Sequence, residues 1–340
     1  MVTTETHVAA PAAVWFDRRR LTATALTILN RYSFGFAFLL MVALLLANLF
    51  EVDFNFGWSD QLANFAPMAL AAMASTPAII SGGGGFDLTI SPLMYFVGEI
   101  FIVWLASSGL GGAESVPIVM AIGAGVGMLN GLLIIGLRVQ PVVATLSMFF
   151  VLIGADLQIA PDPKYLNQTW LQHLAHSVTI FGVGIPGALF TLCFPLAVWG
   201  LLGLIPYKRT LYAVGSNDAT AFSSGVNVAL VRVVAYTLGG LFASVGSLAL
   251  VGLTVSSNAN LSQTYTLLAI ASVALGGTSL WGGRGGLFGS LLGAASIYLL
   301  GNLLQILQVD PSYLQVMYGG MLIFAVILSG IAARARVVAT

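Results

Sequence analysis

The sequence has little charge and almost no cysteine. Only 7% of its 340 residues are charged, whereas a soluble domain carries roughly a quarter of its residues as Asp, Glu, Lys or Arg. The single cysteine, Cys193, excludes an intrachain disulfide and a cysteine-based metal cluster. The formal net charge of zero gives no support to a nucleic-acid partner, and we expect none.

Motifs of several enzyme classes are also missing. The sequence contains no GxxxxGK[ST] phosphate loop, no HExxH zinc motif and no GxSxG nucleophile motif. We therefore expect no ATP hydrolysis by a phosphate loop in this chain, and an enzyme is the less favoured class. His173 and His176 have the spacing of metal ligands on a helix, but no carboxylate or cysteine is placed to complete a site, so we predict no metal.

Apolar residues, by contrast, are abundant. They make up 58% of the chain, and the mean hydropathy is +0.97. A helix needs roughly 20 apolar residues to cross a bilayer, and lipid excludes open sheet edges. We therefore predict an all-α, polytopic membrane protein with ten transmembrane helices. Their approximate ranges are 32–50, 62–80, 92–106, 117–137, 142–158, 187–205, 233–254, 266–280, 287–304 and 314–331.

The distribution of positive charge indicates how the spans are oriented. Short cytoplasmic loops collect Lys and Arg, and with the N-terminus inside, 11 of the 12 cations fall on the cytoplasmic side. Only Lys164 lies outside. We therefore expect a cytoplasmic N-terminal segment at 1–31, a membrane domain at 32–331 with a cytoplasmic loop at 208–232, and a cytoplasmic tail at 332–340.

The third and eighth predicted spans are short and are flanked by glycine. SGGGGFDLTISP precedes the third, and GGTSLWGGRGG follows the eighth. Such segments at corresponding positions of two five-span halves, which would be inverted repeats, point to the translocation region. Close helix packing is the alternative explanation. The glycines that we assign to broken helices are Gly84, Gly85, Gly276, Gly277, Gly282 and Gly283.

The segment 208–232 is the longest polar interruption in the second half of the chain. Its middle predicts a short helix, with Ser216 or Asn217 as N-cap, Asp218 in the first turn and Gly225 as the stop. A helix of about two turns is not stable alone in water. We therefore expect this helix to pack on the cytoplasmic face of the protein or on a partner.

Few ionisable residues lie inside the predicted spans. They are Glu99 in the third and Asp156 near the outer end of the fifth, where solvation is the alternative to a function. A charge in lipid is costly, so each is a functional candidate. Hydroxyl and amide groups suit a neutral solute but also serve as interhelical hydrogen bonds. Our candidates for a translocation path are Asn64, Asp87, Glu99, Asn130, Ser272 and Asn302.

Three stretches together resemble the permease subunits of bacterial ABC importers for ribose, xylose and related monosaccharides, which are similar to branched-chain amino acid permeases. GGFDLTI at 84–90 is similar to GGIDLSV of that family, and LYAVGSNDATAFSSGV at 211–226 to LYAxGxNxxAxxxSGI. LGGTSLWGGRGGLFGSLLGA at 275–294 is similar to LGGTSLxGGxGxxxGxxxGA. NGLLI at 130–134 and PVVATL at 141–146 follow in the family's order, so the resemblance covers residues 60–330.

The resemblance implies an alternating-access permease in the bacterial plasma (inner) membrane. It implies a homo- or heterodimer of permeases among membrane lipids, two cytoplasmic ABC ATPase subunits and an extracytoplasmic solute-binding protein. ATP and Mg would be held by the ATPase, and this chain would hold no cofactor. The predicted short helix would be the coupling helix that docks on the ATPase, with the contact residues Ser216, Asn217, Asp218, Ala219, Phe222 and Gly225.

The sequence departs from the family pattern at several positions. Phe222 stands where the family has an arginine, which predicts a more apolar docking surface. Ser91, Pro92, Ile153 and Gly319 also differ, and they leave the sugar open. The alternatives are a permease for branched-chain amino acids or nucleosides, or a stand-alone secondary transporter in which Glu99 or Asp156 binds the driving ion.

Overall fold

The computed structural model describes residues 33–51, 56–166, 169–180, 183–261, 263–310, 313, 316–321, 323–324 and 327. The predicted spans correspond to helices α2 (Ser33–Glu51), α3 (Trp58–Ile80), α4 (Ile90–Ile100), α5 (Ser115–Gly136), α6 (Pro141–Ile159), α8 (Ala188–Leu201), α11 (Val228–Thr254), α12 (Thr266–Leu275) and α13 (Leu287–Ile306). The tenth predicted span, 314–331, is described only at 316–321, 323–324 and 327, which are helical, and the rest of it lies outside the described residues.

The described helices make the chain a polytopic membrane protein. Five of them are long and apolar enough to cross a bilayer, namely α3, α5, α6, α11 and α13, and three further apolar helices are shorter. The third span continues from α4 into a π-helical turn, η1 (Phe101–Leu105). The eighth, α12, ends at Leu275, five residues before the predicted end at 280.

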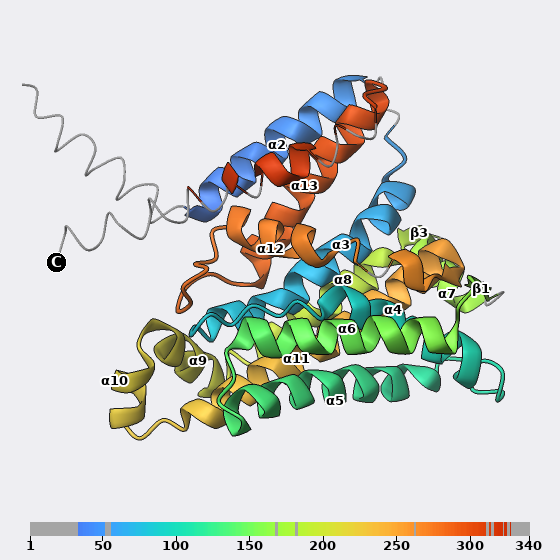
Figure 1. Cartoon of the computed structure of the whole chain (residues 1–340). Coiled ribbons are helices and arrows are strands. Elements are labelled where there is room, and N and C mark those ends of the chain that lie inside the picture. The colour runs from blue at the N-terminus through green and yellow to red at the C-terminus, as the bar shows by residue number, and fades with distance from the viewer. Residues whose placement is uncertain are drawn as a thin grey trace, which may run out of the picture.

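The helices lie between two ends of the molecule (Figure 1). We call the end that carries the short helices α9 (Tyr207–Ser216) and α10 (Asp218–Ser223) the connector end. The opposite end carries α7 (Thr169–Ala175) and the short strands, and α5, α6 and α11 run between the two ends. Helices α2 and α13 pack together on one side of this bundle.

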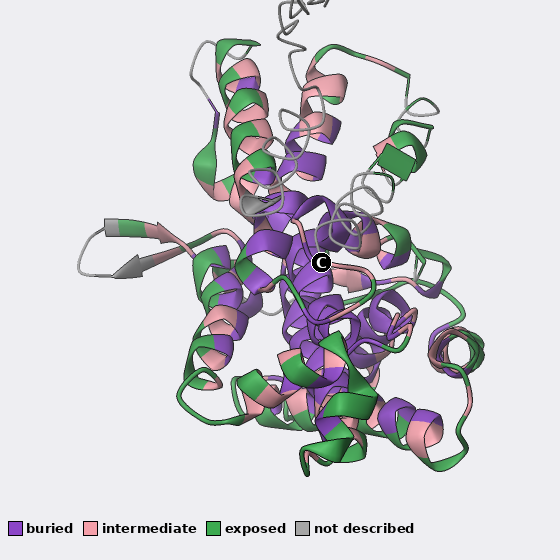
Figure 2. Cartoon of the chain, turned by 90° about the vertical axis from the view of Figure 1, so that its left-hand side faces the viewer, coloured by how far each residue is buried: buried purple, intermediate pink, exposed green. Residues whose placement is uncertain are grey.

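Helix α3 forms the centre of the bundle. From Phe65 to Ile80 all of its residues are buried, because α11, α13, α12 and α8 surround it. A helix that is apolar all round is expected in the interior of a membrane bundle. Figure 2 shows this concentration of buried residues at the centre, with exposed residues on the outer faces of the surrounding helices.

The opposite end departs from the all-α prediction. Strand β1 (Lys164–Tyr165) pairs antiparallel with β4 (Ser256–Ser257), and β2 (Ser177–Ile180) forms a hairpin with β3 (Val183–Pro186). The segment between the fifth and sixth predicted spans therefore contains a helix and strands, which a search for apolar windows does not detect. Helix α7 packs on α11, where the backbone of Leu171 approaches Gly252 so closely that a side chain would not fit.

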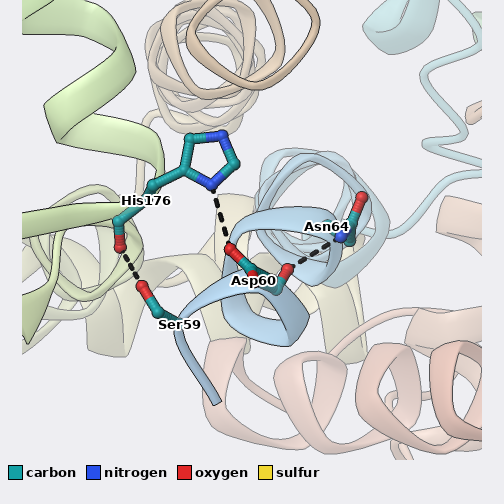
Figure 3. Close-up of polar contacts among 4 residues, drawn as sticks. All are labelled: Ser59, Asp60, Asn64 and His176. Carbon is teal, nitrogen blue, oxygen red and sulfur yellow. Dashed lines mark hydrogen bonds and ion pairs between the residues drawn. The ribbon is translucent and has the colours of Figure 1, made fainter. Parts of the chain in front are cut away.

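A polar contact ties this outer segment to the start of α3 (Figure 3). His176 Nδ1 lies 3.2 Å from Asp60 Oδ1, and the Ser59 hydroxyl donates a hydrogen bond to the His176 carbonyl oxygen. Asn64 Nδ2 donates to the Asp60 carbonyl oxygen at 2.8 Å. His176 thus has a structural partner across the chain, and His173 is exposed to solvent.

The two glycine-rich segments both lie at the connector end. Helix α4 begins after the segment 81–89, whereas α12 ends before the segment 276–286. An inverted repeat relates segments at opposite faces of the membrane. The two glycine-rich segments themselves are therefore not equivalent under an inverted repeat. The correspondence predicted for the third and eighth spans, which are the short helices α4 and α12, stays a prediction.

Helices α5 and α11 pack backbone to backbone. A Cβ atom on Gly127 would overlap the Tyr236 carbonyl oxygen and lie 3.1 Å from the Gly240 nitrogen. A Cβ atom on Gly123 would overlap the Ser244 hydroxyl. Small residues allow this approach, and dispersion contacts between helices are the main attraction available in lipid.

This packing predicts that Gly127→Ala destabilises the protein. The added methyl group has no space, and overpacking costs about 1–3 kcal/mol. Gly125→Ala is the matched control, because nothing lies within 4 Å of its added Cβ. Thermal unfolding in detergent should show a lower Tm for Gly127→Ala alone; equal Tm values for the two variants would contradict the close approach.

Candidate functional site

The connector contains two short helices where the sequence predicted one. In α10, Asn217 Oδ1 accepts a hydrogen bond from the Thr220 backbone nitrogen at 2.9 Å, and Asp218 lies in the first turn. Gly225 follows with a φ of +83°, a left-handed conformation that favours glycine. Ser216 ends α9, which was not predicted, so Asn217 alone is the N-cap.

One face of α10 is free. Ala221 is its only buried residue and packs toward the rest of the chain, whereas Asp218 and Ala219 are exposed. The Phe222 ring is 72% exposed. An aromatic ring presented on a two-turn helix at the surface is suited to insertion into a pocket of another protein.

Helix α9 is wedged between the two glycine-rich segments. The contact is made by Gly82, Gly215, Gly282 and Gly283, which we call the glycine junction. A Cβ atom on Gly82 would lie 2.9 Å from Gly215 Cα, and one on Gly282 would lie 2.5 Å from Gly82 Cα. The Gly283 nitrogen donates a hydrogen bond to the Ile80 carbonyl oxygen at 2.9 Å. Three segments far apart in the sequence therefore touch through backbone atoms alone.

Side chains from the connector reinforce this contact. The Tyr212 hydroxyl, on α9, donates to the Gly285 carbonyl oxygen at 2.6 Å. Burial raises the pKa of this hydroxyl, so it stays protonated and keeps its donor role. Arg232, in the first turn of α11, pairs with Asp218 at 3.0 Å and lies directly over Gly83. Helix α9 thus holds the second glycine-rich segment, and α10 is linked to the first through Arg232.

The first glycine-rich segment is also tied to the helices around it. Asp87 Oδ1 accepts hydrogen bonds from the Thr89 hydroxyl and backbone nitrogen, and Asn130 Nδ2 donates to the Thr89 hydroxyl at 2.9 Å. Thr145 donates to the Phe86 carbonyl oxygen at 3.1 Å. Because α5 and α6 each contribute a donor, a movement of this segment is transmitted to both.

The second glycine-rich segment is anchored to α13. A Cβ atom on Gly276 would overlap the Gly289 carbonyl oxygen. The Thr278 hydroxyl accepts from the Gly286 nitrogen at 3.3 Å, which closes the segment on itself. Of the other glycines predicted to break helices, Gly84 and Gly277 have positive φ values, and a side chain on Gly85 would overlap the Ala78 carbonyl oxygen.

The six candidates for a translocation path do not converge on one surface. Asp87 and Asn130 are brought together through Thr89, whereas Glu99 lies farther along α4. The others each bond elsewhere: Asn64 to Asp60, Ser272 to Leu268 of its own helix, and Asn302 to Asn48 of α2. A path lined by all six stays a prediction.

Four residues of the site were not singled out from the sequence. Gly82 and Gly215 lie inside motifs that the sequence shows, SGGGGF and LYAVGSN, but nothing in the sequence indicates that they meet. Tyr212 and Arg232 were likewise unassigned. Their roles depend on which segments the helices bring together, so no local pattern contains them.

The glycine junction predicts the effect of Gly215→Ala. The added methyl group would overlap the Ile80 carbonyl oxygen and lie 2.5 Å from the Gly283 nitrogen, and such overpacking costs about 1–3 kcal/mol. Amide hydrogen exchange should become faster in α9 and in 276–286. Gly200→Ala is the control, because Gly200 is exposed on α8 and nothing lies within 4 Å of its added Cβ atom. Unchanged exchange in Gly215→Ala would show that the junction is loose.

Comparisons with known proteins give consistent matches. The chain matches the family described as "Branched-chain amino acid transport system / permease component" over residues 57–326. It is similar to the ribose import permease protein RbsC of Escherichia coli (strain K12), with 31% identity over 268 residues that cover 76% of this chain and 81% of that protein.

Two further relatives are named for other solutes. The fructose import permease protein FrcC of Rhizobium meliloti is 27% identical over 275 residues, which cover 78% of this chain and 75% of that protein. The autoinducer 2 import system permease protein LsrD of Photorhabdus temperata is 26% identical over 311 residues, which cover 87% of this chain and 90% of that protein. No solved structure matches the chain.

Proposed function

Because this chain belongs to the family of branched-chain amino acid transport system permease components, we propose that it is the membrane-spanning permease subunit of an ABC importer. The observation that carries the proposal is the exposed helix α10, which presents Phe222 and is linked through the connector to both glycine-rich segments. A permease needs such a link, because the energy source and the solute path lie in different subunits.

The proposal assigns ATP and Mg to partner ATPase subunits. Each ATPase would take up the free face of one α10, with Asp218, Ala219 and Phe222 at the contact and Ser216, Asn217 and Gly225 at its edges. A second permease, identical or different, and an extracytoplasmic solute-binding protein would complete the complex. In this arrangement the chain lies in the bacterial plasma (inner) membrane with both termini in the cytoplasm.

The geometry supports a direct transmission of movement. Displacement of α10 by the ATPase would move Arg232 and α9 together, since Asp218 binds Arg232 and α9 precedes α10 without a loop. At the glycine junction, α9 would push backbone against backbone, where no flexible side chain absorbs the motion. Helices α4 and α12 would follow, because each begins or ends at a glycine-rich segment. This would open and close the path in alternation.

A sugar of the monosaccharide class is the solute that we propose. Relatives named for ribose and fructose import support it. The autoinducer 2 relative, which covers more of the chain at lower identity, and the description of the family keep branched-chain amino acids and other small polar solutes as the second candidate. Ligand binding to the purified cognate solute-binding protein distinguishes them.

Replacing α10, Asp218–Ser223, by a Gly-Ser linker of the same length tests the coupling. The glycine junction remains, but the docking surface is lost, so we expect ATP-driven uptake in proteoliposomes to fall to background. The solute-binding protein should still bind. Uptake that persists with the linker would remove α10 from the coupling, and uptake that needs no ATPase at all would favour the secondary transporter.

Phe222→Ala tests the apolar anchor within α10. Loss of a ring at the centre of an interface costs about 2 kcal/mol or more, so ATPase binding should weaken roughly thirtyfold or further. Docking of the solute-binding protein should not change. Ser223→Ala is the control, since this exposed hydroxyl bonds only within its own helix, to Ala219. An equal loss of ATPase binding and solute-binding-protein docking would count against the role of Phe222.

A further inference from the structure

Two carboxylates inside the bundle have no hydrogen-bond partner. Glu99 on α4 and Asp156 on α6 are both 0% exposed. None of their four carboxylate oxygens accepts a hydrogen bond from the described residues. Buried polar groups are almost always paired, and unpaired carboxylates in a membrane span are costly enough to need an explanation.

The two side chains lie on surfaces that pack together. Helix α4 packs on α6, and Asp156 shares the buried face of α6 with Thr145 and Leu152 at helical spacing. The carboxylate of Asp156 is within electrostatic range of that of Glu99. The two like charges would therefore repel one another if both groups were ionised.

Cations are scarce around them among the described residues. Lys164 lies on β1, which contacts η1 and pairs with β4 beside α4, but it is exposed and forms no ion pair with either carboxylate. The helices packed on α4, which are α3, α5, α6, α11 and α12, contain a single Lys, Arg or His, Arg232. Arg232 lies at the connector end and binds Asp218. The other titratable groups on these helices and their edges are Tyr95, Tyr236 and Tyr265, which are neutral, and Asp60, which pairs with His176. Asp87, before α4, is held by Thr89.

A third unpaired polar group lies against the turn of α4 that contains Glu99. The Ser247 hydroxyl on α11 is 1% exposed and unpaired. It would lie 3.1 Å from a Cβ atom on Gly98, the residue before Glu99. Helix α11 thus contributes an unpaired hydroxyl at the turn of α4 that carries Glu99.

We propose that Glu99 and Asp156 form a proton-binding site that joins α4 to α6. A proton from water binds one carboxylate and forms a carboxylic acid, whose O–H can then donate to the other group; no other bond forms or breaks. Two ionised carboxylates in a low-dielectric interior would each lose several kcal/mol of solvation without compensation. Protonation removes that cost, and it replaces a repulsion by an attraction.

The site lies toward the end of the bundle that is opposite to the connector. Asp156 lies one turn before the end of α6 that is distant from the connector, where its carbonyl oxygen accepts from the Ala160 nitrogen at 2.8 Å. The π-helical turn η1 directly follows Glu99 on α4, and such turns are frequent at functional sites. The same α4 begins at the first glycine-rich segment. The proposed proton site therefore lies on α4, a helix that the connector also contacts through the first glycine-rich segment. Proton binding at this site requires neither ATP nor transport that is driven by an ion gradient.

Infrared spectroscopy of the full chain in lipid nanodiscs tests the proposal. At neutral pH the wild-type protein should show the carbonyl stretching band of a protonated carboxylic acid, with the expected downshift in D₂O. The double variant Glu99→Gln, Asp156→Asn should lose intensity equivalent to at least one carboxyl group per chain. Asp60→Asn is the matched control: this carboxylate is exposed and paired, so the band should stay.

Three outcomes would overturn the proposal. The first is a double variant whose carboxylic acid band equals that of the wild type, which means that both groups are ionised. The second is a band that appears only when Na⁺ and K⁺ are replaced by choline, which assigns an alkali cation site. The third is a wild-type spectrum without a D₂O-sensitive carboxylic acid band at neutral pH, a result that does not depend on whether the double variant folds.

Discussion

Backbone atoms of three distant segments touch at the glycine junction, where the nearest side-chain atom is the Ser216 hydroxyl beside Gly283. This contact depends on the absence of Cβ atoms at Gly82, Gly215, Gly282 and Gly283, since any one of them would overlap a neighbour. Side-chain contacts yield by changing rotamer, whereas contacts between peptide units do not. The connector, the start of α4 and the end of α12 therefore form a stiff unit, and the remaining helices are arranged around it.

The membrane explains why the rest of the bundle also depends on close helix packing and on hydrogen bonds within the protein. Lipid offers no hydrogen bonds, so each interruption of a helix must be satisfied by the protein. The segment 81–89 achieves this through Thr89, Asn130 and Thr145, and 276–286 does so through Thr278 and Tyr212. Close approach of helices at Gly127 and Gly252 follows the same constraint, because dispersion replaces the hydrophobic effect as the attraction between helices. Glu99 and Asp156 differ from Asp87, because neither carboxylate accepts any hydrogen bond from the described residues.

Most helices could be predicted from the sequence, and so could one part of the site, the short helix α10. Apolar runs placed nine of the ten predicted spans on described helices, and capping chemistry predicted α10, because Asn217, Asp218 and Gly225 act within a few residues of one another. Sequence reasoning missed α9, α7 and the strands, which are too short to be found by a search for apolar windows of about 20 residues. It placed the two glycine-rich segments beside the third and eighth spans but did not show that they meet at the same end. Local patterns report local geometry, and none of them contains the pairing of distant segments.

The sequence by itself determined that this is a polytopic membrane protein of the permease family, since hydropathy and motifs are properties of short windows. It also determined the presence of a capped helix in the connector and of a carboxyl group in the third span. Only the tertiary structure decided that Gly215 fits between Gly82 and Gly283, that Arg232 lies over Gly83, and that Asp156 faces the helix of Glu99. The physical reason is that contacts between residues distant along the chain arise from the packing of whole helices, and a single substitution of glycine by a larger residue would change them without altering any local signal.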